Sequence, residues 1–544
     1  MIIDSEPTRL AAEHLAVVLA DGTRLLDDVS IAVRPRQVVA IIGESGTGKS
    51  TLLDTLAGLR APTSGAVRFG DAAGEPVVGY VPQDDIVHRE LTVDATVRYS
   101  ARLRLPPGTS PAVIDAAVEQ TVAMLGLTAR RHQSVHSLSG GQRKRVSIAT
   151  ELVTQPHVCF LDEPTAGLDP IAAAALMDVL RGLADEGTAI IMTTHNLEDL
   201  RVADRLVALT HGGRVAFDGP PADAPRHFAV GDMADVCRVL ATTSVETSNA
   251  PVGRTRSRTR SRVQATPRRR PNSPFTQWRI LARRNIELIT RNRMSLAIMA
   301  GSPVLVVVMF AVLFAPGAFD QQTSNPTASV AITYWISFAG FFFGLTFGLL
   351  QICTELAVLR RERLVAIDVG PYVLAKAAVL VPALGAVNVV MVATLVALGR
   401  LPGHDLTQVG QLLGILVLDS LAGLALGLLA SASVLNPAQA ALALPMLCFP
   451  AVLFSGAVLP LRSMTAVGRA IGALMSDRWA FEAVARTLHL EGTLVASAGG
   501  RHIAAEHGGA FSGSLLSHSL VIVALTTILL VGAHAVVGRR TRLG

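Results

Sequence analysis

The chain has 544 residues, of which 50% are hydrophobic and 17% are charged. This balance excludes a mainly disordered protein, which needs low hydrophobicity and a high net charge. It contains four cysteines, too few and too widely spaced for a disulfide-held secreted scaffold or a cysteine metal site. The net charge of +6 is compatible with contact to nucleic acid or to an anionic membrane surface.

The sequence divides into parts of different character. Residues 1–240 alternate apolar runs with helical patterns, which predicts an α/β domain. Residues 241–273 are a linker by composition, because arginine alternates with serine and threonine without apolar periodicity. Residues 274–544 are dominated by long apolar runs and predict an all-α transmembrane domain. The first residues show no apolar stretch of a cleavable signal, so we expect the N-terminal domain to be cytoplasmic.

Six apolar runs are each close to the ~20 residues needed to cross a bilayer. They lie near 295–315, 330–352, 373–398, 409–432, 440–460 and 516–538. Six crossings would return the C-terminus to the cytoplasm and place most arginines that flank the runs on the inside, as the positive-inside bias expects. The stretch 461–515 fits less well, because it would lie outside and yet carries five arginines.

A phosphate-binding loop is predicted at residues 43–50, which read GESGTGKS and match G-x-x-x-x-G-K-[ST]. An apolar strand pattern at 38–42 precedes the loop, and a helical pattern follows it. The glycines let backbone N–H groups turn towards phosphate oxygens, while Lys49 would reach the β- and γ-phosphates and the Ser50 hydroxyl would bind Mg²⁺. The predicted nucleotide-binding residues here are Gly43, Glu44, Ser45, Gly46, Thr47, Gly48, Lys49, Ser50 and Thr51.

A second apolar strand, at 157–161, ends in an acidic pair, Asp162 and Glu163. A carboxylate at the end of a strand beside a phosphate loop suits a Mg²⁺ ligand, which predicts that role for Asp162. The next carboxylate, Glu163, is placed to orient or deprotonate an attacking water. We therefore expect Glu163 to be the catalytic base.

Between these two motifs, residues 138–142 read LSGGQ, and the whole order of motifs resembles the ATP-binding-cassette (ABC) ATPases. That order is the phosphate loop, Gln83 in VGYVPQDD, LSGGQ, LDEP, Asp169 in AGLD, and His195 after AIIMTT. The resemblance covers about residues 10–230 and implies an α/β P-loop ATPase that uses ATP and Mg²⁺. It further implies that Gln83 contacts Mg²⁺ and the attacking water, that His195 holds the γ-phosphate, and that Asp169 lies at a contact between two cassettes.

In this family the LSGGQ signature acts on the nucleotide of another subunit. The resemblance implies that the signature would cap the γ-phosphate held by a partner, through Ser139, Gly140, Gly141 and Gln142. ATP would then be buried between two cassettes, and its binding energy would drive their closure. A homodimer with two working sites is the economical prediction, and a heterodimer with another half-transporter stays open as the alternative.

Two departures from the family pattern affect expectations. The stretch HLAVVLADGTRLL offers no aromatic residue to stack on adenine, so weak base binding and contact with other apolar groups are both open. The usual Pro-Gly-Glu turn before the phosphate-loop strand reads Pro35-Arg36-Gln37 here. A glycine would permit a left-handed turn, so we expect Arg36 to make the turn in another way.

A single cassette placed before six crossings resembles the G subfamily of ABC transporters, the white/multidrug-type half-transporters. Glu355, Tyr372 and Lys376, and the string SDRWAFEAV at 476–484, are similar to its membrane domain. The resemblance implies an ATP-driven half-transporter that dimerises and exports a hydrophobic or amphipathic cargo across the plasma membrane. Lipid, lipid-linked glycan, peptide and drug all stay open as cargo. The alternative is a membrane ATPase that transmits force or a signal without moving a cargo.

Three further features of the second half and the linker carry predictions. Gly340, Gly344 and Gly348 form a row that permits close helix packing. Asp419, inside the fourth apolar run, is either functional, near the outer interface, or bonded to Ser420 or a neighbouring helix. The linker arginines are interpreted as a spacer in contact with membrane lipids or as part of a phosphorylation site. Nucleic-acid binding is not expected, because no folded reader accompanies the run.

Overall fold

The computed structural model describes residues 8–70, 77–242, 272–315, 319, 325–365, 367–401, 405–497, 499–507, 510–511 and 513–541. The arginine run at 253–270 lies outside the described residues, so the interpretations of the linker stay predictions. The chain forms two compact units. The first extends to Ser273 and includes the segment Arg361–Ile367, and the second contains Pro274–Arg360 and Asp368–Arg542.

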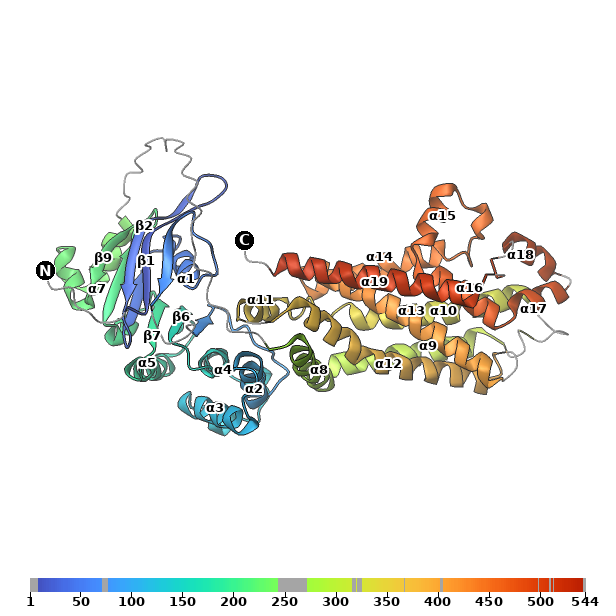
Figure 1. Cartoon of the computed structure of the whole chain (residues 1–544), viewed down its shortest axis with the longest axis horizontal. Helices are drawn as coiled ribbons and strands as arrows, with labels where there is room; N and C mark the ends of the chain where they lie inside the picture. Colours follow the sequence, from blue (N-terminus) through green and yellow to red (C-terminus); the bar gives the residue numbers. More distant parts are fainter. Residues whose placement is uncertain are drawn as a thin grey trace. The chain divides into compact units, whose positions relative to one another are not determined.

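The first unit is built on two β-sheets (Figure 1). Its strands are β1 (Leu10–Val18), β2 (Arg24–Val33), β3 (Val38–Ile42), β4 (Ser64–Phe69), β5 (Val78–Val81), β6 (Val158–Asp162), β7 (Ala189–Thr193), β8 (Arg205–Leu209) and β9 (Val215–Gly219). A three-stranded antiparallel sheet has the order β2-β1-β4. A six-stranded sheet has the order β5-β6-β7-β3-β8-β9, with β9 antiparallel and the other strands parallel.

Helices cover the six-stranded sheet, which confirms the predicted α/β class. They are α1 (Lys49–Leu56), α2 (Val93–Arg104), α3 (Pro111–Met124), α4 (Gly140–Leu152), α5 (Pro170–Asp185), α6 (Ala224–His227) and α7 (Met233–Thr242), with short 3₁₀ turns at Thr128–Arg130, Val135–Ser137, Leu197–Val202 and Pro221–Asp223. Every residue of β3 is buried. Val38, Ala40 and Ile42 enter one hydrophobic core, while Val39 and Ile41 enter another. The strand is apolar throughout because both of its faces are covered.

The register of the parallel strands gathers their carboxyl ends at one edge of the sheet. Ile41 at the end of β3 pairs with Thr193 of β7, and Thr193 pairs with Asp162 of β6. Segments that follow neighbouring parallel strands emerge at the same edge, where α/β proteins bind their ligands. The phosphate loop after β3, the acidic pair and His195 after β7 therefore emerge together.

The turn before β3 corrects one expectation. Arg36 itself adopts the left-handed conformation, with φ of 64°, so the prediction of a different turn is wrong. The Arg36 carbonyl accepts a hydrogen bond of 2.8 Å from the Arg181 guanidinium. The Gln37 side chain accepts another, of 3.1 Å, from the backbone N–H of Arg34. These two bonds offset a backbone cost of about 1–2 kcal/mol for a residue that carries a Cβ.

Replacing Arg36 by glycine should stabilise the first unit. The Arg36→Gly variant keeps both hydrogen bonds, because neither uses the Arg36 side chain, and it removes the steric cost. Allowing for the larger unfolded-state entropy of glycine, we expect a gain of about 0.5 kcal/mol. The measurement is the thermal unfolding midpoint of the full chain in detergent. Arg34→Gly is the control, since Arg34 has no positive φ, and equal loss of stability in both variants would contradict the argument.

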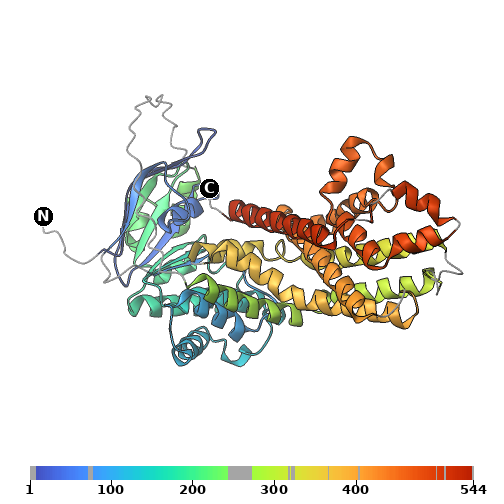
Figure 2. The ribbon, with the colours of Figure 1, turned by 45° about the vertical axis from the view of Figure 1, so that its right-hand side comes forward.

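The second unit is helical, and both views show its long helices running side by side (Figures 1 and 2). Its helices are α8 (Pro274–Arg291), α9 (Arg293–Leu313), α10 (Pro326–Gly348), α11 (Leu356–Val365, shared with the first unit), α12 (Val369–Ala397), α13 (Leu406–Ser433), α14 (Pro437–Phe454), α15 (Ala466–Ala473), α16 (Ser476–Thr487), α17 (Leu490–Ala496), α18 (Gly500–His507) and α19 (Leu515–Arg540). Six of them, α9, α10, α12, α13, α14 and α19, are long and apolar enough to cross a membrane. This confirms the predicted domain of six spanning helices.

Glycines bring α10 and α13 into close contact. A Cβ atom added at Gly344 would lie 1.9 Å from the Ser420 carbonyl oxygen, and one at Gly348 would lie 2.7 Å from the Leu424 oxygen. On the opposing helix, a Cβ at Gly423 would lie 2.2 Å from the Phe341 oxygen. The two backbones therefore touch where a larger residue has no room, which confirms the predicted packing at Gly344 and Gly348.

Two spanning helices end earlier than predicted. The prediction that the fifth span reaches residue 460 is wrong, because α14 ends at Phe454. Gly456 then takes a left-handed φ of 85°, a conformation that stops helices. The run to 352 is also too long, because α10 ends at Gly348. The Ser431 hydroxyl accepts hydrogen bonds of 3.0 Å from the N–H groups of Ile352 and Cys353 and stabilises the turn instead.

Candidate functional site

The phosphate loop leads directly into a helix whose N-terminus has no side-chain cap. Gly48 is the N-cap of α1, with φ of 94°, and no side-chain hydrogen bond caps the helix. A Cβ atom at Gly48 would lie 2.4 Å from the Leu25 carbonyl oxygen, so this position requires glycine. The N–H groups of the first turn and the positive end of the helix dipole are thus available to an anion, which is what a phosphate group requires.

Lys49 lies across this loop. Its ammonium donates to the carbonyl oxygens of Gly43 and Glu44 at 2.8 and 2.9 Å. Burial lowers the pKa of Lys49, and the carboxylates of Glu163, Asp162 and Glu44 act in the opposite direction. The loop is tightened further by the Thr47 hydroxyl, which donates to the Glu44 carbonyl at 2.9 Å. A cation held over a ring of backbone donors is suited to the terminal phosphates of a nucleotide.

The predicted metal ligands Ser50 and Asp162 are neighbours. The Ser50 hydroxyl donates to the Asp162 carboxylate at 3.3 Å, a separation that fits adjacent ligand positions around Mg²⁺. Both groups are hard oxygen donors, as Mg²⁺ prefers, and bound ATP would add phosphate oxygens. Among the described residues, no group of three or more His, Cys, Asp or Glu side chains could hold a metal.

The three predicted catalytic side chains meet at Glu163. Its carboxylate accepts a hydrogen bond of 3.3 Å from the Gln83 amide, and the same oxygen lies 3.3 Å from Nδ1 of His195. Glu163 has a left-handed backbone, with φ of 47°, which is costly for a residue other than glycine. Its N–H donates to the Thr193 hydroxyl at 3.0 Å and helps to hold this conformation.

Thr193 is a site residue that the sequence analysis missed. Its hydroxyl is fully buried, accepts from the Glu163 N–H, and donates to the Asp162 carboxylate at 2.5 Å. One side chain of β7 thus holds the Asp162 carboxylate and the Glu163 backbone at the end of β6. A threonine inside an apolar strand gives no sequence signal of such a role, because threonine is common in strands.

Removing the Thr193 hydroxyl should weaken the metal site as well as turnover. We expect Thr193→Val to lower the ATPase rate by about tenfold and to raise the Mg²⁺ concentration needed for half-maximal rate, because the half-buried Glu163 N–H loses its acceptor and Asp162 loses a donor. Thr193→Ser, which keeps the hydroxyl, should restore both values. Titration of ATPase activity with Mg²⁺ checks this, and an unchanged Mg²⁺ requirement in Thr193→Val would contradict the positioning role.

Lys144 is a second residue that the sequence analysis missed. This buried lysine of α4 donates to the carbonyl oxygens of Gln83 and Pro82 at 2.7 and 3.1 Å. Burial lowers the pKa of Lys144, opposed chiefly by the carboxylate of Asp85. The helix that begins at the LSGGQ signature therefore holds the Gln83 loop. The available signal was rarity, since lysine occurs at three positions in the sequence, and the others are Lys49 and Lys376.

The signature residues lie apart from this cluster within the chain. Ser139 is the N-cap of α4 and forms a capping box with Gln142. Ser139 and Gly140 are exposed, and the side-chain hydrogen bonds described for Ser139 and Gln142 join them to each other. Asp169 likewise caps α5 through the Ala172 N–H at 2.9 Å. One chain thus presents a catalytic cluster and, separately, an exposed helix N-terminus.

Asp419 is held by a neighbouring helix. It is fully buried in α13 and accepts a hydrogen bond of 3.0 Å from the Ser476 hydroxyl of α16. The predicted bond between Asp419 and Ser420 is wrong. The Ser420 hydroxyl instead donates to the Gly340 carbonyl and accepts from the Asn388 amide, each at 2.8 Å. Asp477, next to Ser476, is also fully buried. Asp419 and Asp477 are thus two fully buried carboxyl groups on the packed helices α13 and α16.

The residues that resembled the family's first cytoplasmic loop form a cluster in the second unit. The Lys376 ammonium lies 2.6 Å from the Glu355 carboxylate and 2.8 Å from the Asn285 side-chain oxygen. The Tyr372 hydroxyl donates to the same carboxylate at 3.2 Å. These contacts tie α8 and α12 to the turn after α10. Since a charged lysine inside a helix bundle needs such partners, the cluster explains why these residues occur together.

Comparison with known proteins agrees with both halves of this description. Residues 26–166 match the ABC transporter family, and residues 276–488 match the ABC-2 type transporter family. An ABC transporter ATP-binding/permease protein of Mycobacterium tuberculosis is 31% identical over 86% of this chain and 56% of its own length. ABC transporter G family member 51 of Oryza sativa subsp. japonica is 38% identical over 36% of this chain and 15% of its own.

A solved ATP-binding subunit of an ABC transporter is 28% identical over 43% of this chain and 99% of its own, with a TM-score of 0.38. The chain spans about half the length of the Mycobacterium relative and less of the G family members. The predicted family resemblance is confirmed by the order of the two matched domains. The chain thus joins an ATPase domain of the ABC transporter family to a membrane domain of the ABC-2 type transporter family.

Proposed function

We propose that the chain is an ATP-driven half-transporter that dimerises and exports an amphipathic or hydrophobic cargo across the plasma membrane. The main support for this proposal is an arrangement within one chain. The residues expected to bind ATP form one cluster, and the LSGGQ signature lies outside that cluster. Lys49, Asp162, Glu163 and Thr193 meet at the sheet edge, while Ser139 starts an exposed helix elsewhere. A second copy would supply the missing donor group.

The site supports hydrolysis of ATP by the following roles. The phosphate loop and Lys49 bind the β- and γ-phosphates, and Mg²⁺ held by Ser50, Asp162 and Gln83 would neutralise their charge when bound. Glu163 accepts the proton of the attacking water, since its carboxylate is held by Gln83 and faces His195. His195 then lies where it would donate to the γ-phosphate and stabilise the charge that develops there.

Contacts inside the first unit link the strand before Gln83 to Arg361. The Glu151 carboxylate accepts from the Tyr80 N–H at 3.2 Å, on the strand that leads to Gln83, and lies 2.7 Å from the Arg104 guanidinium. Its other oxygen lies 3.9 Å from the guanidinium of Arg361. Arg361 belongs to α11, the helix that follows the second spanning helix in the chain, so we propose that movement of the Gln83 strand shifts Glu151 and, through it, Arg361.

The proposed topology places the ATPase domain and both termini in the cytoplasm. Six spanning helices return the chain to the side on which it starts. Arginines flank the helix ends on that side, including Arg291 and Arg293 before and at the start of α9 and Arg539 and Arg540 at the end of α19. This distribution follows the positive-inside bias. The end at which α13 and α19 begin would accordingly face outwards.

Reconstitution tests the proposal and separates it from its alternative. The full chain in liposomes should show vanadate-sensitive ATPase activity and should move a fluorescent lipid between leaflets only with ATP and Mg²⁺. Lys49→Ala is the control, because it removes the phosphate-binding cation. ATPase activity with no ATP-dependent movement of lipid, peptide or drug probes would favour the force- or signal-transmitting ATPase. Absence of ATPase activity would remove the enzymatic core of the proposal.

A further inference from the structure

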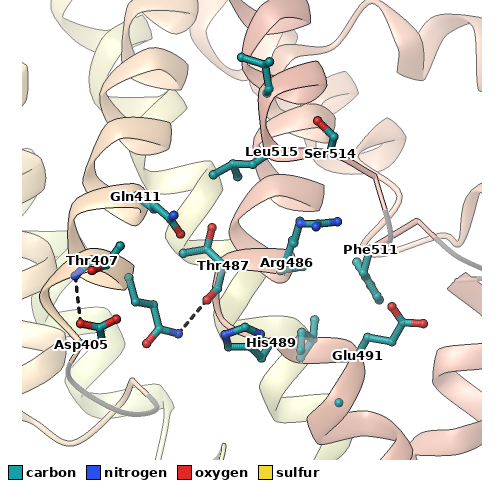
Figure 3. A pocket seen from close by; sticks show the side chains of 15 residues that line it. Asp405, Thr407, Gln411, Arg486, Thr487, His489, Glu491, Phe511, Ser514 and Leu515 are labelled. Atoms are coloured by element: carbon teal, nitrogen blue, oxygen red, sulfur yellow. Dashed lines mark hydrogen bonds between the residues drawn. The ribbon is translucent and has the colours of Figure 1, made fainter.

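A polar cavity opens at the end of the membrane unit where α13 and α19 begin (Figure 3). Its volume is about 930 Å³, and α13, α16, α17 and the start of α19 contribute its walls. Figure 3 shows Asp405, Thr407 and Gln411 on one side, with Arg486, Phe511 and Glu491 across from them. The cavity is large enough for a sugar or another polar group of similar size.

The chemistry of the polar cavity favours an uncharged, hydroxyl-rich group. Carboxylates of Asp405 and Glu491 can accept hydrogen bonds from hydroxyls, and Gln411 offers both a donor and an acceptor. The amide nitrogen of Gln408 donates to the Thr487 carbonyl at 2.7 Å. Phe511 adds an apolar ring, packed edge-on against Phe481 at 5.8 Å. With two carboxylates, one guanidinium and the His489 imidazole in its lining, the polar cavity has no excess of positive charge that would select a phosphate group.

An apolar groove continues from the polar cavity into the spanning region. It holds about 520 Å³ between α13 and α19, and Gln411 and Leu515 line both spaces. The remaining lining residues are mostly aliphatic: Leu413, Gly414, Ile415, Val417, Leu418 and Ser519. A Cβ atom added at Gly414 would meet no other atom within 4 Å. The groove thus offers hydrocarbon contact along helices that span the bilayer.

We propose that the polar cavity and the apolar groove together bind a lipid with a neutral glycosyl headgroup, its tail lying between α13 and α19. A soluble sugar would leave the groove unfilled, and an anionic phospholipid would meet the carboxylates of Asp405 and Glu491. The continuity of the two spaces through Gln411 and Leu515 matches a molecule with a polar end and an apolar end. The inference rests on the proposed export function and specifies the class of its cargo.

Photo-cross-linking in nanodiscs tests this site. The probes are a monoglucosyl diacylglycerol and a phosphatidylglycerol that carry the same diazirine tails, so they differ in headgroup alone. We expect the glycolipid to label peptides containing 411–418 and 515–519, and the phosphatidylglycerol to label them several-fold less. Gly414→Leu, which fills the groove, should reduce glycolipid labelling by about tenfold, equivalent to about 1.4 kcal/mol of binding free energy. Gln411→Leu should abolish the preference between the headgroups.

Gly385→Leu is the matched control, because Gly385 of α12 also has no atom within 4 Å of an added Cβ and lies outside both spaces. Retained ATPase activity shows that each variant is folded. Equal labelling by the two probes, or undiminished labelling of Gly414→Leu, would contradict the proposed lipid site. If ATP-driven lipid export persists without labelling here, this site fails and the proposed function stands. If labelling occurs but ATP drives no export, the proposed function fails instead.

Discussion

Glu163→Gln should lower the steady-state ATPase rate by about 10²–10⁴-fold, the usual contribution of a positioned general base. Glutamine keeps the size of the side chain and can still contact Gln83 and His195, so the pocket should retain its shape. It cannot accept the proton of the attacking water. ATP binding should therefore continue while hydrolysis stops, and the protein should accumulate as an ATP-bound dimer.

The measurement pairs phosphate release with the amount of nucleotide retained after gel filtration. Glu186→Gln is the matched control, since Glu186 is an exposed residue at the end of α5, and it should behave as the unmodified chain. A Glu163→Gln protein that hydrolyses ATP at an ordinary rate would show that another group accepts the proton. Loss of ATP binding together with hydrolysis would instead indicate that Glu163 supports the fold of the loop, against the catalytic role.

Dimers that combine two different inactive chains should regain activity. Lys49→Ala disables the phosphate loop, and Ser139→Arg blocks the signature, so each homodimer should be nearly inactive. In a mixed dimer both lesions fall in one site if signatures act across the interface, which leaves the other site intact. Doubly tagged dimers, isolated by two affinity steps after co-expression, should then show about half of the unmodified ATPase rate if the two sites work independently.

This experiment discriminates between ways of completing the site. If each chain used its own signature, every site in the mixed dimer would carry one lesion and no activity would return. If the chain pairs only with a different half-transporter, doubly tagged material would not form. The exposed start of α4 at Ser139 favours recovery, because a second copy could reach it from solvent while the Lys49 loop lies elsewhere in the same unit.

Much of the nucleotide site was predictable because its chemistry depends on residues that are consecutive in the chain. A phosphate loop binds phosphate through backbone N–H groups that are consecutive in the chain, so the motif GESGTGKS is enough to predict the geometry of the loop. The acidic pair after an apolar strand was predictable for the same reason. The contacts of Thr193 and Lys144 were not, because each depends on which strand or helix lies next to the site, and pairing between distant segments leaves no local pattern.

The sequence by itself predicted the two-part organisation, the six candidate spanning helices and the phosphate-loop motif, because composition and short motifs act over a few residues. Tertiary structure alone decided the left-handed turns at Arg36 and Glu163, the early end of α14 and the partner of Asp419. It also decided that a polar cavity and an apolar groove meet at Gln411. These features depend on contacts between segments far apart in the chain. No single stretch of sequence is therefore enough to predict them.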